Sequence, residues 1–169
     1  MKIALACLLG GSILAVASCG GAESGPGAAP SVASSVPARK AEPSINGAPG
    51  PELQKRFGIS VPESATNVSY GHLQVEGGGD LWVTFKTGRD GLGSFLSSLG
   101  IGEESMTAGV IAFTSNDLEM TGWSIDSAHL LKGIMAPAKD DDMKSPSHKV
   151  TVDYADPGLM AVYVLAGKP

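Results

Sequence analysis

The fold is indicated most clearly by one stretch, Asp80-Leu81-Trp82-Val83-Thr84-Phe85-Lys86. Its apolar residues Leu81, Val83 and Phe85 recur at every second position, which is the period of a strand with one buried face. The preceding residues 65–75 are rich in β-forming side chains and show no helical period. We therefore predict two neighbouring strands in this part of the chain.

A helix is predicted directly after these strands. Residues 87–90 suit a turn in which Asp90 caps the helix, and Gly100 is placed to end it. Between these positions, apolar residues follow at helical spacing: Leu92, Phe95, Leu96 and Leu99. A shorter helix is predicted at residues 51–58, because this segment begins with proline and ends with basic residues and a glycine.

The C-terminal part is predicted to form a β-hairpin. Residues 149–154 and 159–165 are rich in β-formers. The intervening Ala155-Asp156-Pro157-Gly158 carries the proline and glycine that suit a tight turn.

The middle of the domain has weaker patterns. Residues 109–113 and 118–123 each suit a short strand, and residues 126–132 suit a helix capped by Asp126. Residues 137–147 are polar and rich in turn formers, so we expect an exposed loop there.

These elements predict a single α+β domain over residues 51–169. We expect a mostly antiparallel sheet, with one main helix and one or two short helices packed on one face. Of the 169 residues, 43% are apolar and 17% are charged, which is enough apolar material for one core. The net charge of −5 and the scattered basic residues make nucleic acid an unlikely partner, since phosphate binding needs a concentrated basic face.

The N-terminal residues 1–18 have the pattern of a secretory leader. Lys2 gives a positive start, residues 3–16 are an apolar run, and small residues follow. The run is shorter than the roughly 20 apolar residues of a membrane-spanning helix. The end of the leader, Val16-Ala17-Ser18-Cys19, resembles the lipobox of bacterial lipoproteins. An ordinary signal peptide with an incidental cysteine is the alternative.

The lipobox resemblance implies a lipid anchor at Cys19. The leader would be removed, and the sulfur of Cys19 would take a diacylglyceryl group with fatty chains such as palmitate. Each buried methylene adds ~0.8 kcal/mol, so a doubly acylated Cys19 would stay at the membrane. The implied partner is thus membrane lipid, on the extracytoplasmic face of the cell membrane. Cys7 lies in the leader, which leaves a mature chain with one cysteine and no internal disulfide.

Between the anchor and the domain, residues 19–50 are predicted to hold the lipidated cysteine and a disordered linker. Gly, Ala, Ser and Pro dominate this stretch, and large apolar residues are almost missing from it. Five short stretches of the domain carry a further resemblance: residues 62–68, 82–85, Phe95-Leu96, Gly122-Trp123 and Val152-Asp153. In these stretches the domain resembles small uncharacterised lipoproteins of actinobacteria. The resemblance implies an architecture and no activity.

Two motifs fall short of catalytic or cofactor signatures. Gly91-Leu92-Gly93 precedes a helical run as a dinucleotide-binding loop would, but Leu96 occupies the third glycine position. Gly122-Trp123-Ser124-Ile125-Asp126 begins like a nucleophile elbow, but Asp126 replaces its final glycine. A base for Ser124 is not identifiable among His72, His129 and His148. We therefore assign no catalytic residue and no cofactor.

Metal and recognition signals are equally weak. Asp140-Asp141-Asp142 lacks the alternation and glycine of a calcium loop, so a solvated acidic loop is the better interpretation. The histidines lie too far apart for a zinc motif, and we assign no metal site. Asn67-Val68-Ser69 matches a glycosylation sequon, which is uninformative behind a bacterial leader. Trp82, facing opposite to Leu81, suits either an exposed recognition residue or a core residue under a second layer, and we favour the latter.

Two classes of function remain. The first is a noncatalytic interaction or accessory module that a membrane lipoprotein presents to an unidentified envelope protein. A filled core with a flat exposed patch would favour it. The second is a small-ligand-binding lipoprotein, or an enzyme with an unrecognised site. That class predicts a deep pocket near His72, His129 or Asp153.

Overall fold

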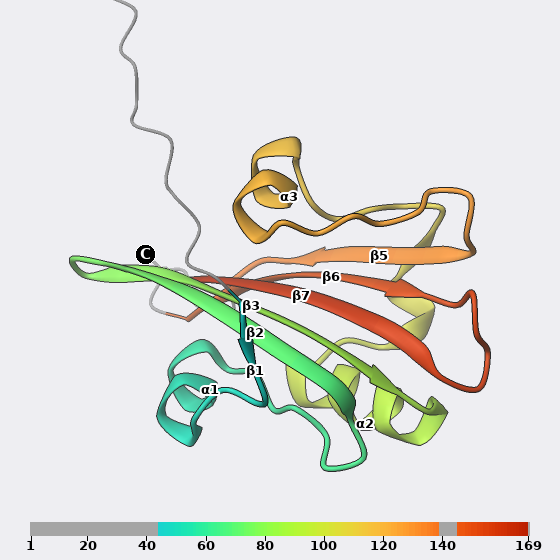
Figure 1. Ribbon diagram of the computed structural model, residues 1–169, viewed down its shortest axis with the longest axis horizontal. Helices are drawn as coiled ribbons and strands as arrows, with labels where there is room; N and C mark the ends of the chain where they lie inside the picture. Colours follow the sequence, from blue (N-terminus) through green and yellow to red (C-terminus); the bar gives the residue numbers. More distant parts are fainter. Residues whose placement is uncertain (1–43, 139–144, 169) are drawn as a thin grey trace, which may run out of the picture. The chain divides into compact units, whose positions relative to one another are not determined.

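The computed structural model describes residues 44–138 and 145–168 (Figure 1). Its helices are α1 (Pro51–Phe57), α2 (Arg89–Leu99) and α3 (Ser115–Thr121), with a 3₁₀ turn at Glu103–Ser105. Its strands are β1 (Ile45–Asn46), β2 (Thr66–Val75), β3 (Gly78–Thr87), β4 (Thr107–Ala108), β5 (Leu131–Ala136), β6 (Ser147–Asp153) and β7 (Met160–Lys168).

The strands of the described residues form one antiparallel sheet in the order β1-β2-β3-β7-β6-β5-β4. The long central strand β3 pairs with β2 on one side and β7 on the other. The predicted C-terminal hairpin is present as β6 and β7. The predicted α+β class with a mostly antiparallel sheet is therefore confirmed.

The first face of the sheet carries the larger core. Leu81, Val83 and Phe85 of β3 are at most 1% exposed on this face, as their alternation predicted. Helix α2 packs against β3 and β7, and its Phe95 meets Phe85 edge to face at 5.2 Å between ring centroids. Helix α1 lies on the same side of the sheet (Figure 1) and adds Phe57 to the core.

The opposite face, which we call the second face, has a smaller core. Trp82 is 1% exposed there and packs with Phe113 and Leu165, so the prediction of a covered tryptophan is confirmed. The covering layer consists of α3 and the segments around it, with Leu118 and Trp123 packed against the cluster. Helices α1 and α2 thus cover one face, and α3 covers part of the other (Figure 1).

Three predictions for the middle of the chain were wrong. Residues 118–123 belong largely to α3, because a capping box between Thr114 and Asp117 starts a helix there. Residues 109–113 are not a strand, since the short β4 ends at Ala108. Residues 126–132 are not a helix; they form a turn that leads into β5.

The ends of two elements also differ from the prediction. The predicted cap of helix α2 was wrong: the N-cap is Gly88, and Asp90 lies in the first turn. Its carboxylate there is stabilised by the positive end of the helix dipole. Within the described residues, the first strand is β1, which lies inside the predicted linker and pairs Ile45 with Tyr70. The leader, Cys19, the linker up to residue 43 and Asp140-Asp141-Asp142 lie outside the described residues.

Candidate functional site

One polar site built from well-separated segments centres on His129. This residue lies just before β5, and its Nδ1 is 2.8 Å from Oδ2 of Asp153 at the end of β6. Leu131 pairs with Asp153 in the sheet, and the Tyr154 N–H donates to the Leu130 carbonyl at 2.9 Å. Backbone pairing of β5 with β6 therefore brings the imidazole to the carboxylate.

Asp153 is held in a fixed orientation. Its side chain is 11% exposed, and its Oδ1 accepts a hydrogen bond from the Ala155 N–H at 2.8 Å. The hydrogen bond from His129 to Asp153 raises the pKa of the imidazole, which burial opposes and the charges of Asp153 and Asp126 reinforce. Burial and the nearby Asp153 charge also raise the pKa of Tyr163.

The second nitrogen of His129 faces another carboxylate. Nε2 lies 3.6 Å from Oδ2 of Asp126, and 41% of the His129 side chain is exposed. In a catalytic triad this nitrogen would meet a nucleophile. Here it meets an acid, so the arrangement is an ion-pair clamp that joins the turn before β5 to the end of β6.

The other two histidines lie elsewhere in the fold. His148 of β6 is buried on the first face, where its Nε2 donates to the Phe57 carbonyl at 2.8 Å and links the strand to the end of α1. His72 lies on β2 opposite Leu81, and its buried Nδ1 has no hydrogen-bond partner among the described residues. The three histidines therefore do not form a shared site: His129 bonds Asp153, His148 bonds the Phe57 carbonyl, and His72 lies apart from both on β2.

A second polar cluster lies on the first face around Glu103. Its Oε1 accepts hydrogen bonds from Lys132 Nζ and the Tyr154 hydroxyl, each at 3.0 Å, and Arg89 lies 3.7 Å from Oε2. The hydrogen bond from Lys132 lowers the pKa of Glu103 most, and burial raises it. The hydrogen bond from Tyr154 and the charge of Arg89 lower it further. Burial, followed by the bond to Glu103, raises the pKa of Tyr154.

Sequence reasoning missed the Glu103 cluster. Lys132 and Tyr154 are 29 and 51 residues from Glu103, so no local spacing could indicate their contact. His129 and Asp153 were each named as markers of a pocket, and the structure brings them together as a pair. It does not place them at the groove described next.

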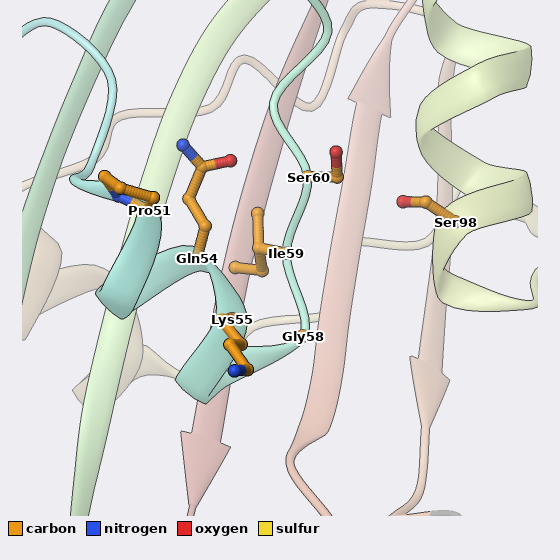
Figure 2. Close-up of a pocket in the computed structure, with 7 residues that line it drawn as sticks. All are labelled: Pro51, Gln54, Lys55, Gly58, Ile59, Ser60 and Ser98. Atoms are coloured by element: carbon orange, nitrogen blue, oxygen red, sulfur yellow. The ribbon is translucent and has the colours of Figure 1, made fainter.

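The groove lies between α1, together with the segment that follows it, and helix α2 (Figure 2). It is open and has a volume of about 390 Å³. Figure 2 shows its lining residues, which are Pro51, Gln54, Lys55, Gly58, Ile59, Ser60 and Ser98. Gln54 is already engaged, since its Nε2 donates to the Pro49 carbonyl and its Oε1 accepts from the Val61 N–H.

The glycine motifs singled out in the sequence have structural roles. Gly91 is buried inside α2 against the Thr87 and Ser64 hydroxyls, where a Cβ atom would overlap Thr87. It allows the helix to approach β3 closely and does not line a phosphate loop. Gly122 ends α3 with a left-handed φ of 69°, so the apparent nucleophile elbow is a helix C-cap.

Within the described ranges, no group of three or more His, Cys, Asp or Glu side chains is arranged to hold a metal ion. Among the helices of residues 44–138 and 145–168, none is both long and apolar enough to cross a bilayer. Comparison with known proteins gave no match among protein-family models, curated sequences or solved structures.

Proposed function

We propose that this chain is a bacterial lipoprotein of the cell envelope, anchored to the extracytoplasmic face of the membrane by acylated Cys19. The observation that carries this proposal is the sequence Val16-Ala17-Ser18-Cys19 directly after an apolar leader. The described domain begins at residue 44, which leaves 24 residues, 20 to 43, between Cys19 and the first described residue. That length gives the domain reach away from the bilayer.

The anchor is tested by mass spectrometry of the protein from bacterial membranes. We expect an N-terminal peptide that begins at Cys19 and carries a diacylglyceryl group. Cys19→Ala should abolish the modification and the membrane retention, whereas Cys7→Ala is a matched control that should change neither. Finding Cys19 without fatty chains, or removed with the leader, would contradict the proposal.

We further propose that the domain is a noncatalytic interaction module presented to another envelope component. The support is that the chain's own side chains fill both faces of the sheet, around Phe85 on the first face and Trp82 on the second. The clearest pair of an acid and a histidine, Asp153 and His129, is used as a clamp closed by Asp126.

Crosslinking in intact cells tests the interaction module. We expect one protein to be recovered with the wild-type chain at a constant ratio, and to be lost with the Cys19→Ala variant, which would leave the membrane. Recovery of abundant envelope proteins in proportion to their concentration alone would argue against a specific partner.

The alternative is a small-ligand-binding lipoprotein, and the groove of Figure 2 is the observation that favours it. Its Ser60 side chain offers a hydroxyl to a polar ligand, and the Ser98 hydroxyl, which donates to the Phe95 carbonyl at 2.7 Å, can still accept a hydrogen bond. NMR of the full chain with pooled envelope metabolites would show saturable shifts at these residues if the groove binds a ligand. Shifts at unrelated surface residues, without saturation, would reject the groove.

A further inference from the structure

The second face of the sheet is closed by one continuous stretch, residues 109–130, which we call the cover segment. Its regular structure is limited to the seven-residue α3. Of its side chains in the second cluster, Phe113 is buried, and the rest are only partly buried: Ile111, Leu118, Met120, Trp123 and Ile125. The first face, by contrast, is closed by α2 with four buried apolar side chains, Leu92, Phe95, Leu96 and Leu99.

Three alternate residues of β6 hold the cover segment by polar contacts. Lys149 Nζ lies 2.6 Å from Oδ2 of Asp117, and Asp153 Oδ2 lies 2.8 Å from His129. Between them, the buried Thr151 hydroxyl accepts a hydrogen bond from the Ala112 N–H at 2.9 Å. Residues two apart on a strand point to the same face, so a single strand supplies one contact to each third of the cover segment.

The layer beneath the cover segment is aromatic and carries a free donor. Trp123 packs edge to face on Phe113 and Tyr163, with ring centroids 5.0 and 5.3 Å apart. Trp82 is fully buried below them, and its indole N–H has no hydrogen-bond partner among the described residues. A buried donor without an acceptor is destabilising and favours any state in which it meets water or a ligand.

We propose that the cover segment opens as a unit while the sheet, α1 and α2 stay folded, and that opening uncovers the aromatic face formed by Trp82 and Tyr163. Opening breaks the three side-chain contacts to β6, the backbone bonds at the two ends of the segment, from the Gly109 N–H to the Leu131 carbonyl and from the Tyr154 N–H to the Leu130 carbonyl, and the small second cluster. It leaves the first core intact, because the sheet separates the two. Proteins open locally where few apolar side chains are fully buried, and that is how the cover segment differs from the rest of the domain.

The frequency of opening is expected to rise both when the pH is lowered and when it is raised from an intermediate range. The charged groups that face His129 are Asp153 and Asp126, and together they raise its pKa. Asp117 is faced by Lys149 and by Thr114. Burial alone would raise the pKa of Asp117, but the hydrogen bonds from Lys149 and Thr114 outweigh it and lower that pKa. The two contacts therefore contribute most to stability between the ordinary pKa values of 3.8 for Asp117 and 6.5 for His129. Opening should be rarest in that range and more frequent on either side.

Hydrogen exchange of the full-length chain in increasing denaturant tests this opening. In the wild type, amides of the cover segment should exchange faster than those of β3 and β7, with a weaker dependence on denaturant. Thr151→Val leaves the Ala112 N–H unpaired and should accelerate exchange of the cover segment by roughly five- to a hundredfold. Lys149→Ala is a milder variant that should accelerate it about two- to fivefold.

The decisive comparison uses Ile101→Val, which weakens only the first core. This variant should accelerate exchange of β3 and β7 by roughly two- to tenfold and leave the cover segment unchanged. If the cover segment instead accelerates together with the strands, it opens only by global unfolding and the proposal is overturned. Fluorescence quenching gives a second measurement, because both tryptophans of the chain lie in the second cluster.

Discussion

The indole ring of Trp82 occupies the space directly over Gly71 of the neighbouring strand, where a Cβ atom would overlap the ring. The two residues are paired in the β2–β3 register, so a side chain at position 71 would compete with the ring for the same space. A glycine at this position is therefore what allows the largest side chain of the sheet to lie flat and fully buried on the second face.

Gly71→Ala should therefore destabilise the domain, by roughly 1–3 kcal/mol, because the added methyl overpacks the second cluster. Gly93→Ala is the matched control. Gly93 lies inside α2 with no atom within 4 Å of its Cβ position, so alanine should stabilise the helix by about 0.5–1 kcal/mol. Urea denaturation of both variants measures the difference. Equal effects of the two substitutions would contradict the packing of Trp82 on Gly71.

His129→Gln should remove a pH-dependent part of the stability. The folded-state pKa of His129 is raised, so its contribution is fully present below the ordinary value of 6.5 and is lost as pH rises through the folded value. The difference in unfolding free energy between wild type and variant should therefore shrink with rising pH. NMR titration of His129 gives the folded pKa directly. Asp126→Asn, which keeps the 2.8 Å bond to Asp153, should retain most of the effect.

Thr114→Ala should destabilise α3 by about 0.5–2 kcal/mol, because it removes one half of the capping box. The Thr114 hydroxyl accepts from the Asp117 N–H at 3.2 Å, and the Asp117 carboxylate accepts from the Thr114 N–H at 2.7 Å. Ser115→Ala, at the next position, touches neither bond and should have little effect. Thermal denaturation compares the two, and equal melting temperatures would show that the cap is unimportant.

Tyr154→Phe should cost about 0.5–1.5 kcal/mol, since it deletes the hydroxyl that donates to Glu103. The ring and its contact with Lys132, 5.4 Å from Nζ to the centroid, would remain. Tyr70→Phe is the control, because no described residue bonds its hydroxyl; it should be close to neutral. A larger loss for Tyr70→Phe than for Tyr154→Phe in urea denaturation would reject the importance of the Glu103 cluster.

The fold was predictable where the spacing of apolar residues in the sequence matches one buried face of a strand or helix. Leu81, Val83 and Phe85 face one filled core, so their alternation identified β3 and, with the turn formers around Pro157, the C-terminal hairpin. The long helix α2 was predictable for the same reason, since its buried side chains recur at helical spacing.

The predictions for the middle of the chain were wrong because tertiary contacts decide its conformation. Residues 109–113 form no strand: Gly109 has a left-handed φ of 72°, and the Ala112 N–H donates to a side chain, that of Thr151, and not to a neighbouring strand. Gly133 interrupts the apolar pattern of β5, since the Val110 carbonyl lies where its side chain would be. The capping box at Thr114 and Asp117 was a readable signal for α3 that the apolar residues 118–123 obscured.

The sequence pointed to individual residues of the candidate site, but not to the contacts between them. His129 and Asp153 are 24 residues apart, and their contact arises from the pairing of β5 with β6. No spacing in the sequence reports that pairing, and the same holds for Lys149 with Asp117.

The two-residue strand β1 has a mechanical consequence. Ile45 and Asn46 pair with Tyr70 and Ser69, and the Gly47 N–H donates to the Val68 carbonyl at 2.9 Å. A pulling force applied to the chain upstream of Ile45 reaches this edge pairing before it reaches any strand of the core. The pairing should peel away under low tension, so that the first extension of the chain leaves the strands of the core unloaded.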